Sequence, residues 1–165
     1  MALSIGDRLP NATFYVLGEK GIEPIQSDAI FAGRTIVLVG VPGAFTPTCH
    51  RNHLPGFIEQ RDAILERGVD EIAVVAVNDA HVLGEWAKAT GAGGGIRFLS
   101  DGNGDFVRAA GLDNDSTLRG MGVRSRRFAM IVEDGIVRWI AIDEVPGQVI
   151  ASSAARILEE LAARA

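Results

Sequence analysis

The chain has 165 residues, of which 47% are hydrophobic and 22% are charged, and it carries a single cysteine. This length and composition predict one globular domain over residues 1–165. The net charge of −5 argues against a nucleic-acid partner, and no apolar run approaches the ~18 residues of a membrane helix. The N-terminus lacks the features of a signal peptide, and one cysteine cannot build an internal disulfide framework, so we expect a reducing cytoplasmic compartment.

Two buried strands flank a long helix in the first half of the chain. The strands are predicted at Thr35–Gly40 and Glu71–Val77, and the helix runs from about Thr48 to Arg67. Apolar residues recur in this helix at intervals of three and four, namely Leu54, Phe57, Ile58, Ile64 and Leu65. The pair Pro55-Gly56 predicts a kink inside the helix, and Gly68 ends it. Strand, helix and strand of these lengths predict a right-handed parallel βαβ unit.

The second half begins with three shorter elements and ends with a hairpin and a helix. The short elements are a helix at Ala80–Thr90, a strand at Ile96–Ser100 and a helix at Asp105–Ala110. Strands at Arg127–Val132 and Ile136–Ile142 are predicted to pair across the turn Asp134-Gly135, and Ala151–Ala163 forms the last helix. A βαβ unit, a β-hairpin and a final helix constitute the thioredoxin arrangement, an α/β fold with a central mixed sheet flanked by helices.

The lone cysteine, Cys49, comes just after the first buried strand, in the segment Val41-Pro42-Gly43-Ala44-Phe45-Thr46-Pro47-Thr48-Cys49. A strand that ends in a Pro/Gly turn delivers this cysteine to the start of the next helix. Free N–H groups and the positive end of the helix dipole favour an anion there, and thiols at helix starts ionise more readily. We therefore predict a reactive thiolate rather than an inert buried cysteine.

The residues around Cys49 resemble the peroxidatic motif of the peroxiredoxins, in which Pro42 and Thr46 precede the cysteine at the same spacing. Further motifs resemble the branch that holds the fifth mammalian class and the plant type II enzymes. These are His53-Leu54-Pro55-Gly56-Phe57, Val77-Asn78-Asp79-Ala80 and Gly84-Glu85-Trp86. The similarity runs from about Ile5 to Phe128 and its hairpin. The resemblance implies a thioredoxin fold enlarged by N-terminal and central insertions, the former including Phe14–Leu17.

Ionisation alone does not make a thiol a fast peroxidase. At pH 7, lowering a thiol's pKa from ~8.5 gains at most about thirtyfold in thiolate, while a drop of three pKa units costs roughly fifteen- to thirtyfold in nucleophilicity. Charge that develops on the departing oxygen must therefore also be stabilised. We expect the Thr46 hydroxyl to orient the sulfur and the peroxide, and the Pro42 ring to shield the thiolate from water.

The resemblance also implies an arginine on a neighbouring strand that holds the thiolate and polarises the peroxide. Arg127 occupies that position, but Arg124 and Arg126 lie close by. Successive side chains on a strand point to opposite faces, so only one of Arg126 and Arg127 can face Cys49. We predict that Arg127 is the arginine that faces Cys49, but the sequence alone does not exclude Arg124 or Arg126 from that role.

The implied activity is the reduction of hydrogen peroxide and organic hydroperoxides through a Cys49 sulfenic acid, in antioxidant defence and redox homeostasis. The regions where this branch would place a second, resolving cysteine contain none, which implies a one-cysteine cycle. The reductant is then an external thiol, and the sequence does not decide between glutathione, glutaredoxin and thioredoxin. No cofactor or metal is implied. Relatives commonly form homodimers near the active site, where Phe45 could lie.

Three other functions compete with this interpretation. A thioredoxin-like redox sensor or holdase chaperone would be oxidised once, without turnover. Cys49 and His53 are four residues apart, so they would lie on one face of a helix, and with His50 or His81 they could bind a metal. A cysteine and a histidine could also form the nucleophile and base of an acyl-transfer enzyme. We expect His50 and His53 to be exposed or structural instead.

Overall fold

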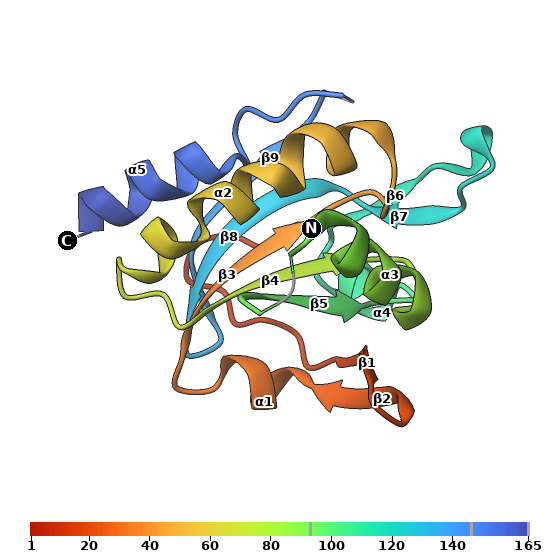
Figure 1. The fold of residues 1–165 in the computed structure, drawn as a ribbon. Coiled ribbons are helices and arrows are strands. Elements are labelled where there is room, and N and C mark those ends of the chain that lie inside the picture. Colours follow the sequence, from red (N-terminus) through yellow and green to blue (C-terminus); the bar gives the residue numbers. More distant parts are fainter. Residues whose placement is uncertain (93, 146, 165) are drawn as a thin grey trace.

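The computed structural model describes residues 1–92, 94–145 and 147–164, and leaves Gly93, Pro146 and Ala165 undescribed (Figure 1). Its centre is a mixed seven-stranded sheet in the order β2-β1-β5-β4-β3-β8-β9. The strands are β1 (Thr13–Gly18), β2 (Gly21–Gln26), β3 (Thr35–Gly40), β4 (Glu71–Ala76), β5 (Ile96–Ser100), β8 (Arg127–Glu133) and β9 (Ile136–Asp143). The helices are α1 (Ser27–Phe31), α2 (Leu54–Leu65), α3 (Ala80–Thr90), α4 (Asp105–Ala109) and α5 (Ala154–Arg164). No helix in these described ranges is long and apolar enough to cross a membrane.

The predicted βαβ unit and hairpin are confirmed. Strands β3 and β4 are parallel neighbours joined through α2, and β8 pairs antiparallel with both β3 and β9. At the hairpin turn, Asp134 and Gly135 both adopt positive φ, +48° and +75°. A two-residue turn of this hand matches the twist of the strands, and Asp-Gly is well suited to it. The hairpin places the start of β8 beside the end of β3, where the cysteine segment begins.

Helices cover both faces of the sheet, because its central strands are apolar on both sides. On β3, Val37 and Val39 join a core with residues of α2, α3 and α5. The alternate residues Ile36 and Leu38 join a second core with residues of α1 and α4. Figure 1 shows α2 and α5 lying along one face of the sheet and α1 on the other. The predicted α/β class with a central mixed sheet is confirmed.

Several small elements were not predicted. At the N-terminus, β2 adds an edge strand beside β1, which contains the predicted Phe14–Leu17 segment, and α1 follows β2. Strands β6 (Asp113–Asp115) and β7 (Val123–Ser125) form a separate two-stranded arm that extends away from the sheet, with a single 3₁₀ turn at Thr117–Arg119 (Figure 1). This arm lies in the stretch left without a predicted element.

The helix predicted over Thr48–Arg67 is divided differently from the expectation. A π-helical turn, Cys49–His53, precedes α2, and the Leu54 N–H donates to the Cys49 carbonyl five residues earlier. Pro55 is the second residue of α2, where its missing N–H costs little. The irregularity therefore lies in the turn before Pro55-Gly56, and it shapes the segment that carries the cysteine.

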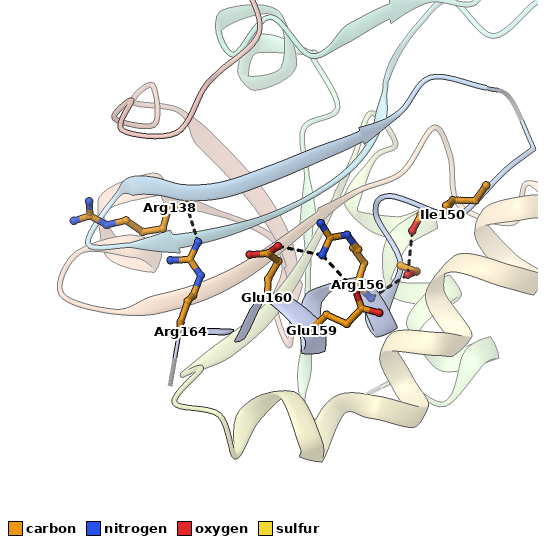
Figure 2. Close-up of polar contacts among 7 residues, drawn as sticks. Arg138, Ile150, Arg156, Glu159, Glu160 and Arg164 are labelled. Atoms are coloured by element: carbon orange, nitrogen blue, oxygen red, sulfur yellow. Dashed lines mark hydrogen bonds and ion pairs between the residues drawn. The ribbon is translucent and has the colours of Figure 1, made fainter. Parts of the chain in front are cut away.

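Helix α5 begins at Ala154, three residues later than predicted, because the preceding backbone has other partners. The N–H groups of Ile150, Ala151 and Ser152 all donate to the Asp143 carboxylate at the end of β9. The far end of α5 is fastened to the same strand, since Arg164 donates to the Arg138 carbonyl at 2.8 Å (Figure 2). Both ends of this C-terminal segment are thus attached to β9.

Candidate active site

Cys49 is fully buried in the first turn of the helix that follows β3. The Thr46 carbonyl accepts the first helical bond, from the His50 N–H at 2.9 Å. The turn before it is held by the Asn78 side chain, which accepts from the Ala44 N–H at 2.9 Å. Phe45 adopts φ +61°, a conformation rare for a non-glycine residue. The strand and this fixed turn together aim the cysteine back toward the sheet.

Arg127 is the arginine that meets the sulfur. It is the first residue of β8, it is 7% exposed, and its Nη2 donates to Cys49 Sγ at 3.4 Å. Arg126 lines the same cavity as Arg127, but its side chain is 40% exposed and lies 3.9 Å from Glu144. Arg124 donates to the Met121 carbonyl at 2.9 Å. The alternation of the strand therefore selects Arg127 as the cation beside the cysteine.

Pro42, Thr46 and Arg127 line one cavity of about 700 Å³, and Arg127 connects this cavity to the buried cysteine. The Thr46 hydroxyl donates to the Gly43 carbonyl at 2.6 Å, so its hydrogen is already bonded and its lone pairs remain to accept a hydrogen bond. Apolar side chains form another part of the wall, namely Pro47, Leu118, Met121 and Val145. The cavity thus offers a donor, an acceptor and an apolar surface.

His53 is a site residue whose contacts the sequence did not reveal. It is 1% exposed, Arg127 Nη1 lies 3.0 Å from its Nδ1, and its Nε2 lies 2.9 Å from the Ser152 carbonyl. Both ring nitrogens face partners other than the sulfur, which argues against an acyl-transfer base. Two signals were available in the sequence, namely its i,i+4 spacing from Cys49 and its place at the start of the motif His53-Leu54-Pro55-Gly56-Phe57.

His50 has a separate role in the same turn. Its Nδ1 accepts from Trp86 Nε1 at 2.9 Å, and its ring stacks on Phe45. Within the described parts of the chain, no three His, Cys, Asp or Glu side chains gather as metal ligands. The two histidines of the turn are therefore engaged in protein contacts.

Burial lowers the pKa of His53 from 6.5 to about 4, with the charge of Arg127 acting in the same direction and the Ser152 carbonyl and Asp143 opposing it. Between pH 6.5 and 4 the unfolded chain therefore binds a proton that the folded chain does not, and the free energy of unfolding falls as the pH falls. The difference between 6.5 and about 4 corresponds to about 3 kcal/mol. Urea unfolding at several pH values should show this loss in the wild type.

The control for this prediction removes the imidazole. His53→Asn should lack the His53 part of the pH dependence, whereas His50→Asn should retain it, because the second variant leaves the buried imidazole in place. Taking the difference between variants also cancels the contribution of Asp143, whose pKa is lowered, despite partial burial, by hydrogen bonds from Ser152, Ala151 and Ile150. Equal slopes for the wild type and His53→Asn would contradict the prediction.

Comparisons with known proteins agree with this fold. The Redoxin family profile matches residues 4–158. Peroxiredoxin-2C of Oryza sativa subsp. japonica is 41% identical over 160 residues, covering 96% of this chain and 98% of that protein. The structure of reduced Prx3 from Vibrio vulnificus in complex with H2O2 has a TM-score of 0.91 at 42% identity, covering 96% of this chain and 99% of that one. The Plasmodium falciparum antioxidant protein, a 1-Cys peroxiredoxin, has a TM-score of 0.91 at 27% identity, covering 98% and 99%. These structures confirm the predicted thioredoxin fold of the peroxiredoxin type.

Proposed function

Because this chain belongs to the peroxiredoxins of the Redoxin family, we propose that it reduces hydrogen peroxide and alkyl hydroperoxides through a one-cysteine cycle at Cys49. The family supports a thiol-dependent peroxidase. The observation that carries the finer proposal is the 3.4 Å contact between Arg127 Nη2 and Cys49 Sγ, because Arg127 also lines the cavity. Antioxidant defence and redox homeostasis follow from this activity.

In the first step, the Cys49 thiolate attacks one peroxide oxygen. An S–O bond forms as the O–O bond breaks, the sulfur loses two electrons, and the departing oxygen leaves as hydroxide or alkoxide and takes up a proton. The peroxide is thereby reduced to water or an alcohol, and Cys49 becomes a sulfenic acid. The Arg127 guanidinium lies beside the attacking sulfur and attracts the negative charge that grows on the peroxide oxygens.

Thr46 and Pro42 act on the same step. The Thr46 hydroxyl donates to Gly43, so toward a peroxide it is an acceptor that orients the O–H group. Pro42 has no N–H and shields the thiolate from water. The apolar wall formed by Leu118, Met121 and Val145 suits the alkyl part of an organic hydroperoxide.

In the second step, an external thiol regenerates the enzyme, because the chain has no other cysteine. The thiolate of glutathione, glutaredoxin or thioredoxin attacks the sulfenic sulfur, releases water and forms a mixed disulfide. A second thiol then cleaves that disulfide and restores Cys49. Since Cys49 is fully buried, this half of the cycle requires the first helical turn to open.

The compartment and the assembly complete the proposal. Glutathione and thioredoxin keep thiols reduced in the cytoplasm, which suits an enzyme that depends on one free cysteine. Phe45 is half-exposed at the turn before Cys49, so an apolar ring is available at a homodimer contact near the active site.

The deciding experiment is a turnover assay with hydrogen peroxide and each thiol donor in turn. We expect many equivalents of peroxide to be consumed per Cys49, with one donor clearly faster than the others. A redox sensor or holdase would instead consume one equivalent and stop. Peroxide consumption no faster than that of free cysteine would refute the peroxidase.

A further inference from the structure

A chain of hydrogen bonds joins the C-terminal segment to the cysteine sulfur. It runs from Asp143 through Ser152 and His53 to Arg127, whose Nη2 reaches Cys49 Sγ. His53, Ser152, Arg127 and Cys49 are all buried. Polar groups are rarely placed in a core without a defined partner, so the order of donors and acceptors along this chain is informative.

The partners of His53 fix its tautomer. A guanidinium has only donors, so Arg127 Nη1 donates to His53 Nδ1 at 3.0 Å. The ring hydrogen must then be on Nε2, where it donates to the Ser152 carbonyl at 2.9 Å. The neutral imidazole is the only form that satisfies both contacts, because a protonated ring would direct a second N–H at Arg127.

The Ser152 carbonyl is itself held in place. The Asp143 carboxylate accepts from the Ser152 N–H at 3.0 Å and from its hydroxyl at 2.5 Å, as well as from the two preceding N–H groups. Beyond this segment, α5 carries its own ion pairs, with Arg156 between Glu159 and Glu160 (Figure 2). The Ser152 carbonyl, which accepts from His53, thus belongs to a segment that several hydrogen bonds hold in place.

We propose that His53 is a positioning residue for Arg127. By accepting a hydrogen bond from Nη1, it directs Nη2 of the guanidinium toward the sulfur and the incoming peroxide. This inference rests on the proposed peroxidase function. An arginine side chain is flexible and has several rotamers, and the one observed for Arg127 places Nη2 on Cys49. A fixed acceptor at Nη1 holds that rotamer before peroxide arrives, so the charge is oriented in advance.

The test compares two replacements of His53. His53→Leu fills the site without an acceptor, and we expect the rate constant for Cys49 oxidation by peroxide to fall about ten- to hundredfold. His53→Asn places an amide oxygen near the Nδ1 position, and should recover most of that loss. His50→Leu is the matched control, since it removes a neighbouring imidazole that does not contact Arg127, and its rate should stay within about twofold of wild type.

A double-mutant cycle separates positioning from a structural role. If His53 acts through Arg127, His53→Leu should change the peroxide rate by less than about twofold in an Arg127→Gln background. The same ten- to hundredfold loss in both backgrounds would overturn the inference. The rate is followed as loss of free thiol in quenched samples, and alkylation of Cys49 by iodoacetamide, which has no O–O bond to polarise, should change far less.

The outcomes also distinguish this inference from the function on which it rests. A wild-type protein that reacts with peroxide no faster than free cysteine refutes the peroxidase itself. A fast wild type with an equally fast His53→Leu variant refutes only the positioning role. Circular dichroism identifies any variant that fails to fold. If His53→Leu fails to fold, His53→Asn and His53→Gln replace it in the comparison. A rate loss in both variants that persists in the Arg127→Gln background would contradict the inference.

Discussion

Replacing Cys49 with serine should abolish peroxide reduction, lowering kcat/KM by roughly 10⁴-fold or more. Serine has nearly the same shape, but its hydroxyl is not ionised at neutral pH and cannot accept an oxygen atom to give a stable intermediate. The chain has no other cysteine that could substitute. Turnover with hydrogen peroxide and a thiol donor measures the loss.

Two controls accompany this variant. Its fold should be retained, because a change of one buried atom leaves the packing around the helix start nearly intact. After exposure to peroxide, a sulfenic-acid-specific reagent should label the wild type and leave Cys49→Ser unlabelled. Thiol-dependent turnover that survived in Cys49→Ser would mean that the reaction occurs elsewhere, and the proposed cycle would fail.

The core of the fold could be predicted because its strands are continuous apolar runs. Thr35–Gly40 is predicted with the bounds that the structure gives β3, and Glu71–Val77 differs from β4 by one residue. Strands that are buried on both faces need such runs, so the sequence signal is strong. The hairpin turn at Asp134-Gly135 was equally predictable from the sequence, since few dipeptides accept two consecutive positive φ angles.

The peripheral strands gave no such signal. Strand β2 is largely exposed and contains Pro24, which is tolerated only at a sheet edge. The arm strands β6 and β7 have three residues each, and β6 consists of exposed polar residues. Their pairing depends on contacts across the chain, which local patterns do not report.

The site shows the same division between local and distant information. Pro42, Thr46 and Cys49 lie within eight residues, and their motif was visible in the sequence. The environment of His53 depends on Arg127 and Ser152, which are 74 and 99 residues away. The four-residue spacing between His53 and Cys49 is compatible with a metal ligand, a catalytic base or a structural histidine. Only the tertiary contacts show that His53 accepts a hydrogen bond from Arg127.

Replacing Arg127 with glutamine should cut kcat/KM for hydrogen peroxide by about 10²–10³-fold, the loss typical of a removed donor at a site of developing charge. Glutamine retains an amide that can still donate to a neighbour, but it removes the positive charge beside Cys49 Sγ. Arg127→Lys keeps the charge without the planar fork, so its activity should lie between those of Arg127→Gln and the wild type.

Arg126→Gln is the matched control, because it makes the same chemical change one residue earlier on a partly exposed side chain. It lies 3.9 Å from the Glu144 carboxylate, and exposed pairs of this kind contribute little to stability. We expect its kcat/KM to stay within about twofold of wild type. If the ranking were reversed, with Arg126→Gln impaired and Arg127→Gln active, the cation that assists peroxide cleavage would be on the opposite face of the strand. The buried contact of Arg127 with Cys49 would then serve packing rather than catalysis.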